Sequence, residues 1–375
     1  MSVACAVSVA NIYYNQPLLP QMAASLQVSG HAIGYLPGFT QAGVAAGMFL
    51  FVPLGDMFPR RRLIILLSLA IALAVLLTAL APSLQWLYFA GFLTGITTIV
   101  PHLVLPFAAK LAPDRRRGQI VGTVLGGLLT GILLARVVSG FAGDWFGWRA
   151  VYFGAAVLMV ILAALVRVNL PEDLPDRRIR YSEMLRSILD LVRTQPVLRE
   201  ASLEGAMLFG AFSAFWSTLV FHLAGAPYHY GGKVAGLFGL VGAAGAAFAP
   251  RAGHLSDRKG AGFTVSVSIS VSIASYLVFA AGGDHLWGLI AGVILMDLGV
   301  QAGHVANQTR IYGLVPEARS RLNTVYMVSY FVGGAIGSAL GAYGWQQAGW
   351  LGVCAAGIVQ LLLAGVVRWR MGGPR

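Results

Sequence analysis

Residues 253–260, GHLSDRKG, lie between two long apolar runs, and a related stretch at residues 55–62, GDMFPRRR, lies between two others. Asp56 and Asp257 stand at matching places, about half of the 375-residue chain apart. Repeats of half the chain length are how many membrane transport folds are built. The sequence therefore predicts two related halves, joined in tandem.

The composition is that of a membrane protein. Hydrophobic residues make up 57% of the chain and charged residues 11%, with a mean hydropathy of +0.74, whereas soluble domains are roughly a quarter charged. The first apolar run has no basic segment before it and continues the repeat, so we interpret it as a retained span. Runs long enough to cross a bilayer, about 20 residues each, recur at 2–24, 33–55, 63–82, 85–108, 119–142, 150–168, 201–223, 234–254, 263–282, 286–309, 322–344 and 350–369.

These runs predict an all-α membrane protein with twelve transmembrane helices in two six-helix bundles. The N-terminal bundle covers 1–168, a cytoplasmic linker covers 169–200 and the C-terminal bundle covers 201–375. Within the linker, apolar and charged residues alternate with helical spacing around Met184 and Ile188. This pattern predicts an amphipathic helix that lies on the membrane surface and tethers the halves.

The net charge of +12 does not indicate nucleic-acid binding, because the basic residues alternate by loop. All of the 26 lysines and arginines except Arg136, Arg149 and Lys233 lie in the even-numbered connections, the linker or the C-terminus. The positive-inside rule then places both termini and the linker in the cytoplasm, with the chain in the inner membrane. Cys5 and Cys354 fall on the first and last helices, near opposite faces, so no disulfide is expected.

The second loop, G-x-x-x-D-R-x-G, resembles the loop signature of the major facilitator superfamily, which occurs between helices 2 and 3 and again between helices 8 and 9. The first copy keeps Asp56, Arg60 and Arg61 of that pattern. Residues 11–20, NIYYNQPLLP, also resemble the first helix of bacterial drug:proton antiporters and of sugar or nucleoside exporters. The resemblance implies alternating access, with helices 1, 4, 7 and 10 around a central cavity and helices 5, 8 and 11 facing the opposite half.

The paired loops predict a latch between the halves. Asp56 ends helix 2, where the helix dipole disfavours an anion, so a positive partner is expected from its own loop or from the start of helix 11. By the repeat, Asp257 would face helix 5. Such contacts exist only while the cytoplasmic side is closed and would favour the outward-facing state. The predicted latch residues are Asp56, Arg60, Arg61, Asp257, Arg258, Arg319 and Arg321.

Helix 1 carries a polar cluster next to a proline. Asn11, Tyr14 and Asn15 share a face by their spacing, and Gln16 follows them. Polar groups inside a membrane must find partners. This face therefore lines either a wet cavity or a hydrogen-bonded helix contact, and we assign these four residues to the substrate cavity.

Helix 10 is the most informative span. Asp297, Gln301, His304 and Gln308 are spaced by 4, 3 and 4 residues, so they share one face. Asp297 lies roughly 18 Å from either end of its span, close to the bilayer midplane, where a charge costs several kcal/mol. We predict that Asp297 carries a coupling proton, with His304 as a relay and both glutamines in the cavity. The alternative is a protonated hydrogen bonder that fixes a helix contact.

Three other polar residues fall inside predicted spans. His102 occupies the place in the first half that His304 occupies in the second, and the pair could titrate near neutral pH. We assign His102 to the substrate cavity. Arg136 in helix 5 needs a counter-charge or an aqueous face, and we assign it to proton coupling. Glu204 lies in the first turns of helix 7, where the helix dipole stabilises an acidic side chain. Its role is therefore either structural or in proton coupling.

We conclude that the sequence predicts a proton-coupled secondary transporter that exports a small organic solute as a monomer. Uptake by symport, or a receptor or scaffold on a transporter fold, are the alternatives. An enzyme is not expected, because no clustered nucleophile and base and no metal-spaced Cys or His set is visible. The absence of a G-x-x-x-x-G-K-[ST] segment indicates that no nucleotide cofactor is bound.

Overall fold

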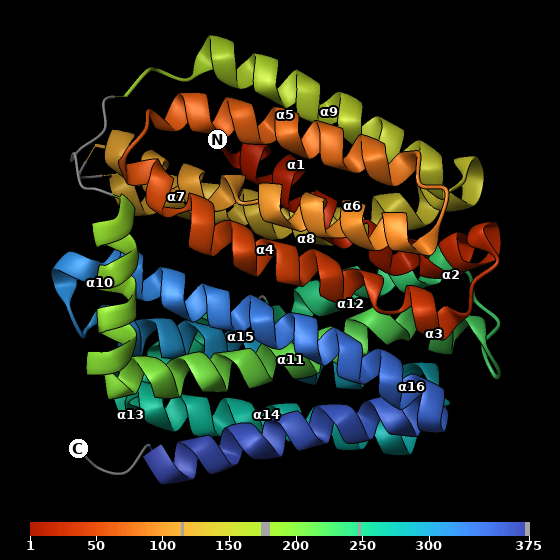
Figure 1. Ribbon diagram of the computed structural model, residues 1–375. Coiled ribbons are helices and arrows are strands. Elements are labelled where there is room, and N and C mark those ends of the chain that lie inside the picture. Colours follow the sequence, from red (N-terminus) through yellow and green to blue (C-terminus); the bar gives the residue numbers. More distant parts are fainter. Residues whose placement is uncertain (114–115, 174–180, 247–248, 372–375) are drawn as a thin grey trace.

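The computed structural model describes residues 1–113, 116–173, 181–246 and 249–371 (Figure 1), which form helices and no strand. The first half contains α1 Ser2–Tyr13, α2 Asn15–Leu26, α3 Gly30–Ile33, α4 Leu36–Phe51, η1 Pro53–Asp56, α5 Arg60–Ala79, α6 Leu84–Thr97, α7 Val100–Leu111, α8 Arg117–Phe146 and α9 Trp148–Asn169. The remainder contains α10 Tyr181–Thr194, α11 Pro196–Ala224, α12 Gly232–Ala246, α13 Ala249–Lys259, α14 Ala261–Gly282, α15 Leu286–Tyr312, η3 Pro316–Ala318 and α16 Arg319–Met371.

Nine helical segments of the described chain are long and apolar enough to cross a membrane. The last of them, α16, has non-helical angles at Ala348 and Gly349 and therefore holds two spans. The first span is divided at Tyr14 into α1 and α2, since the ring of Pro17 crowds the carbonyl four residues before it. When α1 and α2 are taken together as one span and α16 is taken as two spans, the helices agree with the twelve that the sequence predicts.

The helices form two bundles. In the first, α1 packs on α8, α4 on α6 and α5 on α9, and in the second α11 packs on α16 and α14 on α15. Gly147 and Gly260 have φ angles of +81° and +87°, which glycine adopts at little cost, where α8 gives way to α9 and α13 to α14. This arrangement agrees with the predicted all-α membrane fold of two helical bundles.

Helix α10 lies across one end of the molecule, which we call the linker end, and the opposite end is the distal end (Figure 1). It buries Met184 and Ile188 and packs against α11, α16 and η1. The Tyr181 hydroxyl donates to the carbonyl of Leu50 at 2.9 Å. The amphipathic helix is therefore present and touches both halves, whereas its place on a membrane surface and the domain boundaries stay predictions.

The two halves meet mainly along two pairs of helices, α4 with α16 and α8 with α12, and α2 adds smaller contacts with α11 and α12. The close contacts lie toward the distal end: a Cβ at Gly38 would lie 3.1 Å from the carbonyl oxygen of Ala335, and a Cβ at Gly236 only 2.5 Å from that of Arg136. Glycine lets these backbones approach, as expected in lipid. The predicted contact of the glycine-rich helices with the opposite half is thus observed.

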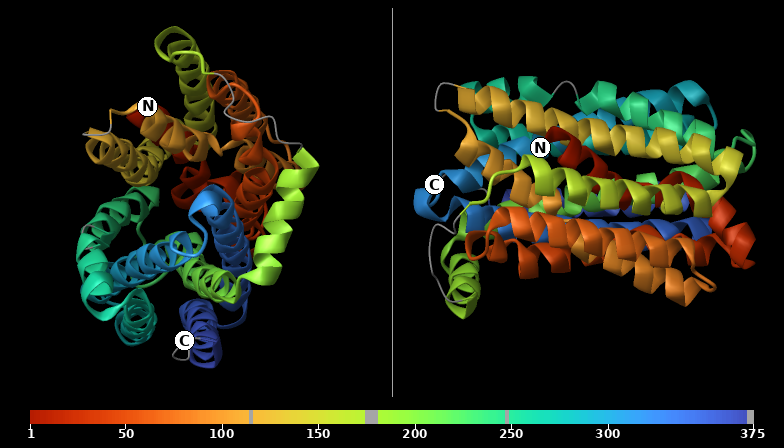
Figure 2. Two further views of the ribbon diagram at one scale, coloured as in Figure 1. Left: turned by 90° about the vertical axis from the view of Figure 1, so that its left-hand side faces the viewer. Right: turned by 90° about the horizontal axis from the view of Figure 1, so that it is seen from above.

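The linker end is arranged differently. Helices α7 and α13 pack against helices of their own halves. Within the described chain, a Cβ built at Gly118, Gly122 or Gly126 of α8 would meet no atom within 4 Å. The left-hand view of Figure 2 looks onto this end and shows the two bundles on opposite sides of the molecule. The halves are therefore joined mainly through their distal portions. Cys5 and Cys354 are both free and buried, as expected.

Candidate functional site

Arg136 lies at the centre of the molecule, on α8, and is only 3% exposed. Its Nε donates to Oε1 of Gln16 at 2.7 Å. Its guanidinium carbon lies 4.1 Å from the ring centre of Trp216 and 4.8 Å from that of Tyr13. Cation–π contacts of this kind hold the flat group in place. Nη2 has no hydrogen-bond partner among the described residues, so a strong donor is left unused.

Asp297 on α15 is the matching anion, at 6% exposure. Its Oδ2 also has no hydrogen-bond partner in the described chain. Of the ion pairs that the structure describes, none joins it to Arg136 within 4 Å, although the two charges interact electrostatically. Tyr330 of α16 also interacts electrostatically with Asp297.

Helix α12 holds the two charged side chains side by side. A Cβ at Gly242 would lie 3.1 Å from Oδ2 of Asp297, and a Cβ at Gly239 would lie 3.5 Å from the Arg136 side chain. These glycines are one turn apart on nearly the same helix face, about 4.5 Å along the axis. The central site therefore brings a cation from one half and an anion from the other to a single face of α12.

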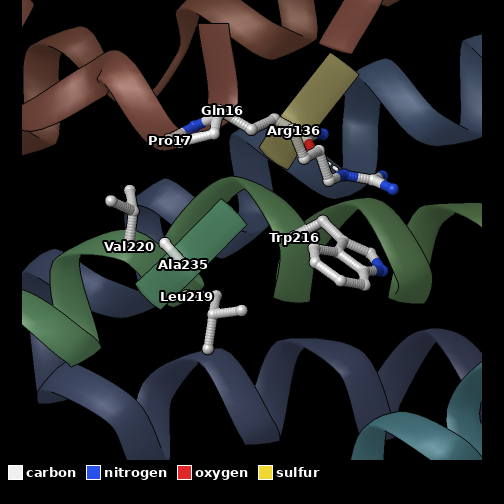
Figure 3. A pocket seen from close by; sticks show the side chains of 7 residues that line it. All are labelled: Gln16, Pro17, Arg136, Trp216, Leu219, Val220 and Ala235. Carbon is white, nitrogen blue, oxygen red and sulfur yellow. Dashed lines mark hydrogen bonds between the residues drawn. The ribbon is translucent and has the colours of Figure 1, made fainter. Parts of the chain in front are cut away.

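A small pocket adjoins Arg136 (Figure 3). Its polar members are Arg136 and Gln16, joined by the hydrogen bond just described, and Trp216 forms one wall. The rest of the lining is apolar and comes from α2, α11 and α12: Pro17, Leu219, Val220 and Ala235. The pocket is small, with a volume of about 10 Å³, which is room for about one water molecule beside Arg136.

The polar face of helix 10 is turned toward α16. Nδ1 of His304 lies 3.1 Å from the hydroxyl of Tyr326, and Nε2 of Gln308 donates to Oδ1 of Asn323 at 3.3 Å. Gln301 is half-buried, between Asp297 and His304 along the helix. His102 on α7 lies within electrostatic range of His304, as the repeat predicts for a pair. This face leads from Asp297 toward the linker end.

Glu204 is fully buried in a cluster of four charges near the linker end. Its Oε2 accepts from Nη1 of Arg310 at 2.7 Å. Oε1 of Glu200 lies 2.6 Å from both Arg310 and Arg368. The cluster is neutral overall and lies within the second half. Because Arg310 is about 20 Å from Asp297 along α15, Glu204 is separated from the central site, and its predicted role in proton coupling remains untested.

The polar residues of helix 1 divide between two environments. Asn11 donates to the carbonyl oxygens of the preceding turn and lies 3.4 Å from the sulfur of Met159. Asn15 donates to Oγ1 of Thr40 at 3.3 Å. In this conformation both residues lie in helix contacts within the first bundle, the second of the two environments predicted for this face.

Tyr14 likewise interacts with Tyr152 of α9 inside the first bundle. Only Gln16, of the four predicted cavity residues on helix 1, lies at the central site. The physical reason is helix geometry, since Gln16 shares its face with Tyr13 three residues earlier. That face meets Arg136, and the face with both asparagines meets the bundle interior.

The predicted latch is not formed between the halves by the contacts described here. The side chain of Asp56 lies outside the described residues, and Asp257 and Arg258 are exposed. The described bonds of the arginines stay within one half or reach the linker helix: Arg60 Nε to the Gly55 carbonyl, Arg61 to Glu172, Arg319 Nε to the Tyr312 carbonyl, and Arg321 to Ser187. The latch therefore stays a prediction for a state closed at the linker end.

Three aromatic residues of the site were not predicted, namely Tyr13, Trp216 and Tyr330. Tyr13 could have been found from its i, i+3 spacing to Gln16. The other two carry no signal that separates them from ordinary aromatic residues in apolar helices.

Comparison with known proteins agrees with this architecture. The model of the Major Facilitator Superfamily matches residues 1–284. The uncharacterized transporter YgaY of Escherichia coli O157:H7 is 41% identical over 370 residues, covering 99% of this chain and 94% of the relative. The probable transporter SCO4007 of Streptomyces coelicolor is 39% identical over 364 residues, covering 97% and 84%. The solved nucleoside transporter NupG superimposes with a TM-score of 0.74 at 15% identity, over 100% of this chain and 99% of its own.

With its family model matched over three quarters of the sequence and two relatives near 40% identity, the chain belongs to the major facilitator superfamily and is a multi-pass membrane transporter, not an enzyme, that works by alternating access of its two bundles.

Proposed function

We propose that the chain is a proton-coupled exporter of a small organic solute and that Asp297 carries the proton. The observation that carries this proposal is the unpartnered Oδ2 of Asp297, buried where the two halves meet. A charge in such a place is costly, and binding a proton removes it. The proton affinity of the carboxyl group depends on whether water and Arg136 reach it, so it changes as the halves move.

The proposal includes a route for the proton. His304 lies two turns from Asp297 on the same helix face, roughly 10 Å away. Gln301 and water could bridge this distance, since water-mediated hydrogen bonds are nearly as favourable as direct ones. The groups that act on Asp297 from neighbouring helices are Arg136 and Tyr330.

Orientation follows from the loop charges. The positive-inside rule assigns the linker end and both termini to the cytoplasm of a bacterium, in its inner membrane. The distal closure then corresponds to an inward-facing state. We propose that the transporter works as a monomer, because the central site is built from the two halves of one chain.

Proteoliposomes test the proposed function. Purified protein is reconstituted with a pH-sensitive dye inside, and a pH gradient is applied with labelled sugars, nucleosides, amino acids and cationic drugs. We expect one class to move against its gradient while protons move the opposite way. Solute movement in the same direction as the protons would identify symport and contradict export.

The matched variants are Asp297→Asn and Asp284→Asn, the second in an exposed connection. Asp297→Asn should still exchange solute down its gradient but lose accumulation driven by pH, whereas Asp284→Asn should behave as the parent does. Full accumulation by Asp297→Asn would place the proton elsewhere, with Glu204 or the pair of His102 and His304 as the next candidates.

A further inference from the structure

The central site contains two charged groups that each have one atom without a hydrogen bond. Arg136 comes from the first half and Asp297 from the second, and both are more than nine-tenths buried. Nη2 of the arginine and Oδ2 of the aspartate have no hydrogen bond in the described chain. Buried charges are costly unless they are paired and hydrogen-bonded. The two groups therefore indicate a ligand that supplies what each lacks.

The order of groups along α12 gives the shape of that ligand. Ala235 lines the apolar pocket, Gly239 faces Arg136 and Gly242 faces Asp297. These three positions span roughly 10 Å of helix. A Cβ at Gly242 would crowd the carboxyl group of Asp297, so glycine lets α12 lie directly against the charged side chains. The site thus presents an apolar group, a cation and an anion in sequence, over the length of one small molecule.

The chemistry of the two charges selects among solutes. A guanidinium binds a carboxylate through parallel hydrogen bonds, and a carboxylate accepts readily from an ammonium group. A purely anionic solute would leave Asp297 without a partner. A purely cationic solute would leave Arg136 without one. A sugar would leave both charges uncompensated. While Asp297 is ionised, a molecule with both charges satisfies both residues at once.

We propose that the solute is a small zwitterion of the α-amino-acid type with an apolar side chain. Its carboxylate bonds to Nη2 of Arg136 and its ammonium group bonds to Asp297. Its side chain lies toward the small pocket beside Leu219 and Val220, which must widen from its present volume of about 10 Å³ to admit it. This inference rests on the proposed function, in which the solute occupies the central site. The ammonium group and the proton then compete for one carboxylate, so each zwitterion that binds releases one proton.

Binding by the purified full chain tests the inference without any gradient. The probes are L-leucine, leucinamide, which lacks the carboxylate, and 4-methylpentanoate, which lacks the ammonium group, measured by calorimetry near pH 7. We expect L-leucine to bind about tenfold or more tightly than either analogue, because each analogue forfeits a charge-assisted hydrogen bond.

Variants assign each preference to its residue. Arg136→Gln should bind L-leucine and leucinamide equally, and Asp297→Asn should bind L-leucine and 4-methylpentanoate equally. Arg149→Gln and Asp284→Asn, both outside the site, should keep the discrimination of the parent. Equal binding of L-leucine and either analogue by the parent protein overturns the inference, and so does a failure of L-leucine to bind.

The two proposals fail in different experiments. Proton flux with a different solute class, together with no binding of L-leucine, would leave the proposed function intact and refute the zwitterion site. If the protein binds L-leucine more tightly than both analogues but shows no proton flux in liposomes, the zwitterion site stands and the proposed function is refuted.

Discussion

Replacing Gly236 by alanine is expected to open the distal end. The new Cβ would lie 2.5 Å from the carbonyl oxygen of Arg136 and 3.2 Å from its carbonyl carbon. Both are backbone atoms, which cannot rotate away, so α8 and α12 must separate. Gly122→Ala is the matched control, because a Cβ there meets no described atom within 4 Å and the gain in helix propensity is the same.

The size of the effect follows from packing energies. Inserting a methyl group into a close-packed contact costs about 1–3 kcal/mol. At about 2 kcal/mol, the ratio of molecules closed at the distal end to molecules open there falls about 30-fold. This cost applies only to the state closed at the distal end, because α8 and α12 are expected to lie apart in the open state.

Distances between spin labels measure this ratio. Labels at Gln85→Cys and His285→Cys, exposed distal positions in opposite halves, are introduced after Cys5 and Cys354 are replaced by alanine. We expect Gly236→Ala to add a population with a longer distance and Gly122→Ala to add none. The reasoning is refuted if Gly236→Ala keeps the parent distribution, or if both variants shift alike.

Two further predictions concern the charged residues near the linker end. Asp56→Asn should fold normally and populate more molecules open at that end, and an unchanged pattern of cysteine accessibility would contradict the latch. Arg310→Met should destabilise the protein by about 3–5 kcal/mol, because it leaves Glu204 buried without its close partner and Glu200 with Arg368 alone. Arg319→Met, at an exposed site, should have little effect, and equal losses of thermal stability in both variants would argue against the cluster.

The helices and the two halves could be predicted because membranes impose a simple rule. Every span must be apolar and about 20 residues long, so the boundaries and the repeat are visible in the sequence. Asp297 and Arg136 could be found for the same reason, since a charge stands out in an apolar run. Both lie at the central site.

Other parts of the site could not be predicted. Spacing tells which residues of a helix share a face, but not which neighbour that face meets, so Asn11 and Asn15 were assigned to a cavity although they lie in helix contacts here. Trp216 resembles any aromatic residue of an apolar helix. The closure of the distal end could not be predicted either, because one transporter sequence must allow both the state closed at the distal end and the state open there.

The presence of Arg136 and Asp297 at one site gives the proposed transport cycle an electrical consequence. With a proton on Asp297 the site carries one positive charge, and with a bound zwitterion it carries none. A cycle that alternates between the protonated site and the zwitterion-bound site moves one elementary charge across the membrane. A membrane potential of 100 mV contributes about 2.3 kcal/mol per charge moved. The membrane voltage would then sustain about a 50-fold solute gradient even when the pH is equal on both sides.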